Sequence, residues 1–498
     1  TSTADIRTAV TLQLTADNNI GLGSAALDSI TTGDDNTAVG MNAMTTTTTG
    51  SNNVSFGRSS MSSNTTGSAN TVVGRNALLQ NTTGARNTAI GGYALDANTT
   101  ANNNTAIGHE CLTTNTTGAS NTAVGKNSMN LCTTGVSNTA MGNESLRSLT
   151  TGDQNVALGV YALDAATSGS ENVAVGYDAL SAATTSAGNT AVGHGASKLT
   201  TGANNTAMGS RALDANVAGT SNVAIGYESL STQSGSQDYN VAVGAYAMQL
   251  NTTGTGNTAL GSQVLDANTS GSNSVGVGYQ ALTANTTGDW NVGIGYGAGD
   301  AITTGSQNVF VGRYAGAYSV TTTTGSLNVC IGPLVHTSSV STDCAIGLGY
   351  NVTAPGDSLT FGCGASDSRI GFGATSITAP SDQRLKEEIT TATAGLSFVN
   401  DLRPVTFKWK KEKDIPADLA GYKEGSEKRF KTDTTEHGFI AQEVKTAIDA
   451  HNEIKDGFDM WSEDSSGGRQ RLGDSSLIPM LVKAIQELSA KVTALENA

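Results

Sequence analysis

The sequence predicts a mainly β protein: a long parallel β-solenoid of 17-residue coils, followed by a small α+β domain that ends in a helix. A phrase of the type Asn-Thr-Ala-Val-Gly recurs at a regular period, which is the signature of stacked repeats. The composition fits such repeats, because the chain has 60 Gly among 498 residues and only 5% aromatic residues. Charge is uneven, since residues 1–380 carry 10 Lys and Arg and 21 Asp and Glu, whereas residues 381–498 carry 17 and 21.

The repeat fixes the predicted organisation of the chain. The glycine that closes the phrase recurs every 17 residues from Gly23 to Gly312, with one spacing of 16 after Gly193 and one of 18 after Gly226. After Gly312 the phrases continue at irregular spacings. We therefore divide the chain as follows: an N-terminal segment (1–18), a solenoid shaft (19–312), an irregular capping or neck region (313–380) and a C-terminal domain (381–498).

Each coil is expected to hold one short strand and two inward patches. In Thr-Ala-Val-Gly we expect the Val or Ile to point inward and stack on its equivalent in the next coil. The Ala-Leu pair that follows, as at Ala77-Leu78, forms the second patch, whose edges lateral association of chains would help to bury. The Gly and Thr-Thr-Gly elements suit corners. The Asn four residues before each glycine, as at Asn36 and Asn53, predicts an amide ladder.

Little in the shaft indicates catalysis or metal binding. The acids that follow Ala-Leu or Val-Leu are irregularly spaced, and with the isolated histidines we interpret them as polar turn or surface residues. We expect no metal site and no cofactor. The acids are Asp28, Asp96, Asp164, Asp214 and Asp266, and the histidines are His109, His194 and His336.

Composition also bears on partners and compartment. A net charge of −15 argues against nucleic-acid binding, which needs a basic surface. No apolar run reaches the ~18 residues of a membrane span, so we expect no membrane insertion. The five Cys form no Cys-x-x-Cys pair, and Cys111 replaces Ala or Ser of other repeats, which predicts a small buried thiol and folding in a reducing cytoplasm.

The C-terminal pattern differs from that of the shaft. Gln383 to Thr391 predicts the start of a helix, with Ser381 or Asp382 as N-cap. A second short helix is expected over 396–402, a strand over 405–409, a charged solvated loop over 410–435, and an extended piece from His437 that leads into a helix.

The last segment carries a heptad seam. Its apolar residues are spaced 3, 4, 3, 4 and 3, which predicts a modest coiled coil and allows a trimer. These residues are Ile478, Leu481, Ile485, Leu488, Val492 and Leu495.

The Asn-Thr-Ala-Val-Gly phrase resembles the repeats in the heads of YadA-type trimeric adhesins, although the repeat of that family is shorter. It is also similar to repeat regions of bacteriophage tail-fibre proteins. The resemblance implies a solenoid that assembles from three chains.

Three motifs in the last 118 residues resemble the endosialidase-type intramolecular chaperone, peptidase family S74. They are Ser381-Asp382-x-Arg384-Leu385-Lys386-x-x-Ile389, Leu402-Arg403-Pro404-Val405-x-Phe407-x-Trp409 and Gly438-Phe439-Ile440-Ala441-Gln442-Glu443-Val444. The resemblance implies a domain that trimerises, directs folding of the β-rich part before it, and then cuts itself off with a Ser-Lys dyad.

The resemblance places the nucleophile at Ser381 and the base at Lys386, with cleavage between Pro380 and Ser381. A Ser hydroxyl needs a nearby base, and a lysine serves when desolvation keeps it neutral. Each chain would cut once, as a single-turnover serine peptidase. Asp382 and Arg384 are expected to shape the turn, and His437, Gln442 and Glu443 to act as supporting, structural residues.

These observations predict a homotrimeric phage tail fibre that is assembled in the host cytoplasm and carried on the virion. Its expected partners are other tail proteins and a host-surface receptor, a saccharide or a protein. A bacterial surface adhesin is the alternative. An ice-binding β-solenoid is a more distant one, because the Thr-Thr pairs lie beside a Gly corner and do not form a flat Thr-x-Thr strand.

Overall fold

The computed structural model describes residues 12–14, 18–233, 235–319, 322–374, 383, 386–417, 421–455, 458, 460–463, 470–473 and 476–497. The chain divides into two compact units, residues 1–380 and residues 381–498. Within the described residues, no helix combines the length and the apolar character that a membrane crossing requires.

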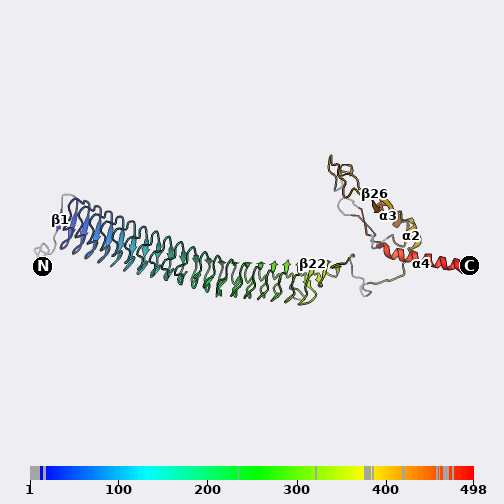
Figure 1. The fold of residues 1–498 in the computed structure, drawn as a ribbon, viewed down its shortest axis with the longest axis horizontal. Coiled ribbons are helices and arrows are strands. Elements are labelled where there is room, and N and C mark those ends of the chain that lie inside the picture. The colour runs from blue at the N-terminus through cyan, green and yellow to red at the C-terminus, as the bar shows by residue number, and fades with distance from the viewer. Residues whose placement is uncertain are drawn as a thin grey trace. The chain divides into compact units, whose positions relative to one another are not determined.

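The first unit confirms the parallel β-solenoid with coils of about 17 residues (Figure 1). Each coil contributes a three-residue strand that pairs in parallel with the strands of the coils before and after it, as in Thr122↔Thr139. The strands are β2 (Ile20–Leu22), β3 (Thr37–Val39), β4 (Val54–Phe56), β5 (Thr71–Val73), β6 (Thr88–Ile90), β7 (Thr105–Ile107), β8 (Thr122–Val124), β9 (Thr139–Met141), β10 (Val156–Leu158), β11 (Val173–Val175), β12 (Thr190–Val192), β13 (Thr206–Met208), β14 (Val223–Ile225), β15 (Val241–Val243), β16 (Thr258–Leu260), β17 (Val275–Val277), β18 (Val292–Ile294), β19 (Val309–Val311) and β20 (Val329–Ile331).

The parallel ladder continues beyond Gly312. Strand β20 pairs with β22 (Ala345–Tyr350), which pairs with β24 (Ser358–Cys363), and a small second sheet joins β21 (His336–Thr337) to β23 (Thr353–Ala354). An antiparallel strand closes each end of the main sheet: β1 (Leu12–Leu14) on β2, and β25 (Ser366–Gly371) on β24. Both ends of the ladder are therefore covered by a strand of opposite direction, a protection that exposed sheet edges need.

The interior of the coil corrects one prediction. The middle residue of each strand, usually Ala, is fully buried, whereas the Val, Ile, Met or Leu after it is half-buried or exposed, as at Ala106 and Ile107. Side chains alternate along a strand, so the Asn and the Val, three residues apart, cannot both point inward. The Ala-Leu patch does point inward, but the chain's own core already buries it, so it presents no edges for lateral association.

The predicted Asn ladder is confirmed. The side-chain amide of Asn36 donates to Oδ1 of Asn19 at 3.0 Å, and that of Asn53 donates to Oδ1 of Asn36 at 3.0 Å. The backbone N–H of Asn36 also donates to Asn19 Oδ1 at 2.9 Å, and its Nδ2 donates to the Gly50 carbonyl at 2.9 Å. Each buried amide is thus shared between successive coils, which satisfies polar groups that would otherwise destabilise the core.

A second amide ladder, which was not predicted, runs along the Thr-Thr-Gly corner. Asn81 donates to Asn64 Oδ1 at 2.9 Å and Asn98 donates to Asn81 Oδ1 at 2.8 Å. The ladder stops at Asn115, whose Oδ1 is buried without a hydrogen-bond partner in the structure, because the next coil has Cys132 at the equivalent position.

The glycine that closes each phrase has a positive φ, whereas the glycine of Thr-Thr-Gly does not. Gly159 has φ +140°, and a Cβ built there would lie 2.3 Å from the carbonyl oxygen of Gly176 in the next coil. Backbone hydrogen bonds between coils continue outside the strands, as from Leu27 N to Ala43 O at 3.2 Å. Successive coils therefore stack closely along most of their perimeter.

Core volume is conserved by compensating substitutions. Phe310 replaces the inward Ala of its strand, and the two positions beside its ring that normally hold Leu hold Gly299 and Gly316. A Cβ at Gly299 would lie 2.5 Å from the ring, and one at Gly316 would lie 2.3 Å from it. The narrow core accepts a large side chain only where its neighbours are small.

The buried-thiol prediction for Cys111 is confirmed, since the side chain is fully buried and burial raises its pKa to about 12. The prediction that the acids simply face water is partly wrong. Asp96, Asp164, Asp214 and Asp266 are half-buried, and burial raises the pKa of each carboxyl, that of Asp96 to about 6.

His336 is not a surface residue either. It is buried, with Nε2 3.0 Å from Thr353 Oγ1 and Nδ1 2.9 Å from the Leu334 carbonyl oxygen.

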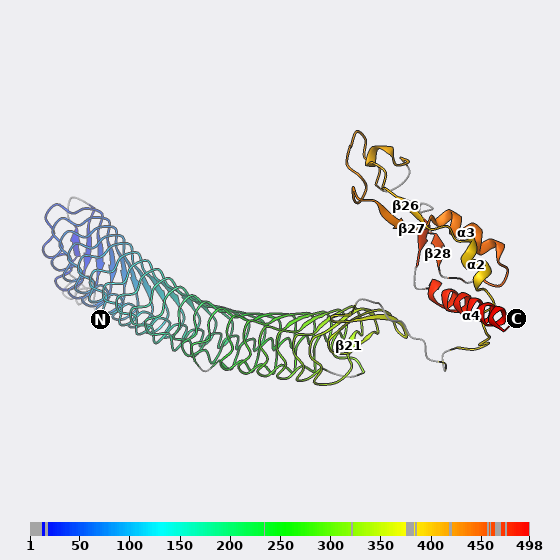
Figure 2. The same ribbon diagram turned by 45° about the vertical axis from the view of Figure 1, so that its right-hand side comes forward.

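The second unit is a small α+β domain (Figure 2). Its helices are α2 (Leu396–Asp401), α3 (Ala441–Ala450) and α4 (Leu477–Glu496), with a 3-10 turn, η2 (Glu412–Asp414). Two antiparallel pairs join β26 (Val405–Phe407) to β27 (Glu436–Gly438) and β28 (Trp461–Glu463) to β29 (Gln470–Leu472). The helix predicted over 396–402, the strand from 405, the strand-to-helix transition after His437 and the terminal helix are confirmed.

Candidate functional site

The predicted cleavage site lies at the boundary between the two units. Pro380, Ser381, Asp382 and Arg384 fall outside the described residues. Of the predicted dyad, the structure describes Lys386, which is exposed and whose backbone N–H donates to the Gln383 carbonyl at 3.1 Å.

The helix predicted over Gln383 to Thr391 is wrong in its described part. Residues 386–391 are not helical, and Glu388 has φ +53°. Within this segment, positive φ at Glu388 interrupts the dihedral angles that a helix repeats. Lys386 therefore lies on an irregular segment. Unlike a helix, this segment does not fix the distance between Lys386 and a serine five residues earlier.

The second and third motifs meet through an ion pair. The Arg403 guanidinium contacts both carboxylate oxygens of Glu443, with Nε 2.9 Å from Oε2 and a second contact from Nη2 to Oε1. The bidentate pair lowers the pKa of the Glu443 carboxyl. Arg403 lies just before β26 and Glu443 lies in the first turn of α3, so the exposed pair connects the helix to the strand.

His437 and Gln442 occupy structural positions. His437 lies in β27 opposite Thr406 of β26, and its side chain is exposed. The side chain of Gln442 is exposed, and its backbone carbonyl accepts a hydrogen bond from Thr446 Oγ1 at 3.0 Å. Neither side chain points into the core of the unit.

Helices α2, α3 and α4 enclose the core of the unit around Phe398. The Phe398 ring meets the rings of Phe458 and His451 edge-on, at centroid distances of 5.6 and 5.5 Å. The cluster also contains aliphatic residues from α3 and α4: Val444, Ala447, Ile448, Leu477 and Met480.

His451 links the ends of two helices. Its Nε2 lies 2.8 Å from Asp401 Oδ2, at the end of α2, and its Nδ1 lies 3.1 Å from Glu453 Oε1. The side chain is only 11% exposed. The hydrogen bond to Asp401 raises the pKa of His451 above its ordinary 6.5, with a further contribution from Glu453. No sequence pattern indicates this pair, because its members are 50 residues apart.

We expect the C-terminal unit to lose stability as the pH rises through the raised pKa of His451. Because the folded-state pKa lies above the unfolded value of about 6.5, the stabilisation is complete below that value and is lost as the pH rises. Thermal unfolding of the full chain carrying Trp290→Phe, followed by the fluorescence of the two remaining tryptophans, Trp409 and Trp461 of the C-terminal unit, should show this decline. His451→Gln should flatten the profile, and an unchanged slope in that variant would assign the decline to other groups.

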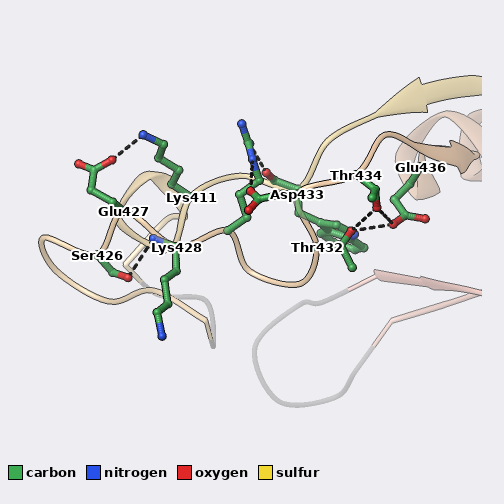
Figure 3. Close-up of polar contacts among 10 residues, drawn as sticks. Lys411, Ser426, Glu427, Lys428, Thr432, Asp433, Thr434 and Glu436 are labelled. Atoms are coloured by element: carbon green, nitrogen blue, oxygen red, sulfur yellow. Dashed lines mark hydrogen bonds and ion pairs between the residues drawn. The ribbon is translucent and has the colours of Figure 1, made fainter.

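The segment predicted as a solvated loop contains an ordered arm (Figure 3). Lys411 and Lys413 both pair with Glu427, and Arg429 pairs with Asp433 at 3.0 Å. Backbone hydrogen bonds join the two sides, as from Glu412 N to Lys428 O at 2.8 Å. The ion pairs are largely exposed, so we assign most of the order to the backbone pairing.

Near the base of the arm, aromatic rings pack against one another. Trp409 meets Phe407 and Phe430 edge-on, with ring centroids 5.5 and 5.8 Å apart. The ammonium of Lys431 lies 4.4 Å from the centroid of the Trp409 ring. The last residue of the second motif, Trp409, thus ties the arm to β26.

The terminal helix α4 has one face packed on its own unit and one face exposed. Glu487 accepts a hydrogen bond from the first N–H of α2, at Leu396, at 3.0 Å. The preceding Gly395 leaves room for it, since a Cβ there would lie 2.7 Å from Glu487 Oε1. The six residues of the predicted heptad seam, Ile478, Leu481, Ile485, Leu488, Val492 and Leu495, are between 39% and 77% exposed.

No group of three or more His, Cys, Asp or Glu in the described part of the chain is arranged to hold a metal ion. Residues 381–452 match the model of a protein family described as chaperone of endosialidase, peptidase family S74. The matched range contains all three motifs and ends before α4. No curated protein and no solved structure matches the chain.

Proposed function

From the match of residues 381–452 to the chaperone of endosialidase family, we propose that the chain is a fibre protein whose C-terminal unit directs trimerisation and folding and then cleaves itself off. The solenoid would be the mature fibre of a phage tail, joined to other tail proteins and contacting the surface of a host cell. The single observation that carries this proposal is the family match directly after a long solenoid.

A solenoid of nearly identical coils has a register problem that such a chaperone would solve. The outward third residue of each strand recurs with the period of one coil, as at Ile90 and Ile107, so three chains can associate one coil out of step at little cost. A C-terminal trimeriser that aligns the chain ends first would remove these alternatives. Removal of the unit after assembly would leave the fibre kinetically trapped.

Two exposed apolar surfaces support association of identical chains. One is the seam of α4. The other is the outer apolar stripe, formed by the third residues of the strands, which recur once per coil and are exposed in ten of the coils. Contiguous apolar surface of this extent is uncommon on monomeric proteins. The stripe consists of Phe56, Val73, Ile90, Ile107, Met141, Leu158, Met208, Leu260, Ile294 and Ile331.

In the proposed cleavage, Ser381 Oγ attacks the carbonyl carbon of Pro380 while Lys386, as a neutral amine, accepts the hydroxyl proton. The C–N bond between Pro380 and Ser381 breaks, the nitrogen of Ser381 takes up a proton, and an ester forms at Oγ. Water then hydrolyses the ester and frees both ends. One chain cuts one bond once.

Gel electrophoresis of the full chain tests the dyad. We expect the unaltered chain to yield a fragment consisting of residues 381–498, and Ser381→Ala and Lys386→Ala each to remain full length. Ser376→Ala and Lys423→Ala are matched controls, because they remove the same groups outside the dyad, and they should still be cut. Continued cleavage in either dyad variant would contradict the assignment, whereas loss of cleavage in the controls would indicate a folding defect.

A further inference from the structure

One side of the solenoid carries a notch that the repeat does not require. In most coils the second residue after the corner glycine has a side chain, for example Tyr93, Asn127, Asp178 and Arg211. At Gly195 it has none. A Cβ built at Gly195 would have a single neighbour within 4 Å, Cγ of Arg211 at 3.9 Å. The missing side chain opens a notch of about 300 Å³.

Backbone geometry does not explain this glycine. Gly195 has φ +61°, but the same position has φ +55° in Ala25, +59° in Tyr93 and +57° in Asn127. The equivalent Gly297 is explained by packing, because a Cβ there would lie 2.6 Å from the ring of Tyr314. At Gly195 neither conformation nor packing excludes a side chain.

Charged side chains of alternating sign line the notch. Lys198 pairs with Asp178 at 2.9 Å, across one coil, and Arg211 contacts Asp214 at 3.7 Å. On its other side Arg211 pairs with Glu228 at 2.9 Å. The hydrogen bond that Lys198 donates to Asp178 raises the pKa of Lys198, which keeps its ammonium charged. Each cation is already matched by a carboxylate of the same chain.

Aromatic rings flank the same notch. His194, which lines the notch, stacks on Tyr177 with an interplanar angle of 9° and a centroid distance of 5.5 Å. Tyr161 meets Tyr177 edge-on at 5.9 Å. The Tyr177 side chain remains 48% exposed, so an apolar ring surface is open to solvent beside the paired charges.

We propose that this notch binds a neutral saccharide. A charged ligand would have to separate ion pairs that are already formed, whereas sugar hydroxyls both donate to carboxylates and accept from Lys198 and Arg211. The C–H bonds on the face of a sugar ring suit the aromatic ring of His194, which lines the notch, is exposed and stacks on Tyr177. The inference rests on the proposed function, since it assigns the receptor of the fibre to a chemical class and to one location on the shaft.

Titration of the full chain with galactose, glucose, mannose and N-acetylglucosamine, followed by saturation-transfer NMR, tests the inference. We expect one of these sugars to bind and glucuronic acid not to bind. Gly195→Asn fills the notch with a residue that the coil accepts at Asn42, Asn76 and Asn127, so its melting temperature should not change. It should weaken binding by at least about tenfold, equivalent to about 1.4 kcal/mol. Tyr177→Ser should weaken binding in the same direction.

The matched control is Gln263→Asn, which introduces the same residue at the same coil position away from the notch and should leave binding unchanged. The inference is overturned if none of the four sugars binds, if glucuronic acid binds in their place, or if Gly195→Asn binds as the unaltered chain does. In each of these cases, a chain that still trimerises and releases residues 381–498 retains the proposed assembly function. Failure of saccharide binding can therefore be told apart from failure of the proposed function.

Discussion

Gly159→Ala is expected to disrupt the solenoid locally and to expose the surrounding coils to protease. At φ +140°, an alanine is in a backbone region that only glycine occupies without strain, at a cost of about 1–3 kcal/mol. Its Cβ would also lie 2.3 Å from the Gly176 carbonyl oxygen, so the next coil would have to move away. Because each coil stacks only on its neighbours, the damage should spread over the adjacent coils and leave distant ones intact. Hydrogen exchange resolved by mass spectrometry measures this directly.

The control for this prediction is Gly195→Ala, two coils further along. It has the same chemical change and also a positive φ, but the angle is +61°, which Ala25 already adopts at the same coil position. Its Cβ would have open space around it. We expect exchange rates near residue 195 to stay as they are. Equal exchange in Gly159→Ala and the unaltered chain would mean that the coils do not depend on close contact at their corners.

The sequence was sufficient to predict the solenoid, because a 17-residue period survives the variation of individual residues. It did not lead to the correct assignment of the inward side chains, although the alternation of side chains along a strand was enough to make it. Asn104 directly precedes the strand that ends at Ile107, three residues later, and alternation alone predicts that they face opposite sides. The familiar preference for Val and Ile in a core favoured the wrong choice, since the core here is too narrow for two rows of large side chains and Ala106 takes the inward position.

The second amide ladder was predictable in the same way. The Asn of Asn-Thr-Thr-Gly at Asn64 and Asn81, and of Asn-Thr-Thr-Ala at Asn98, recurs with the spacing of the first ladder. The compensation around Phe310 was not predictable, because it depends on which residues of neighbouring coils meet inside the core. Such contacts follow from the shape of the coil, and a linear pattern does not carry that shape.

At the candidate site the motifs located the segments but not their conformations. The Arg403–Glu443 pair joins the second and third motifs, although Glu443 was predicted only as a supporting residue and no role was predicted for Arg403. The helix expected at Gln383 was wrong where the chain is described, since a favourable N-cap and early acids do not produce a helix without a face to bury. Residues 386–389 are exposed, and Ile389 is 62% exposed, so this segment buries little apolar surface that would stabilise a helix.

Ile485→Asp combined with Leu488→Asp is expected to convert the assembled protein to monomers. In the proposed trimer these positions lie at the centre of the α4 seam, and each layer would then bury three unpaired carboxylates, which costs several kcal/mol. Both side chains are exposed in the single chain, at 66% and 51%, so the fold of the unit itself should survive. Mass photometry of the full chain, carrying Ser381→Ala so that the C-terminal unit stays attached, measures the change.

The matched control places the same two charges on the solvent side of the helix, as Gln486→Asp and Ala490→Asp. Both residues are exposed and lie about 150° around the helix from the seam, so this variant should remain trimeric. If the seam variant also remains trimeric, the solenoid associates without the terminal helix. If the unaltered chain is monomeric, the register argument for a C-terminal trimeriser fails. A seam variant that is monomeric, with a folded C-terminal unit but a solenoid open to hydrogen exchange, would establish that alignment of the chain ends precedes assembly of the shaft.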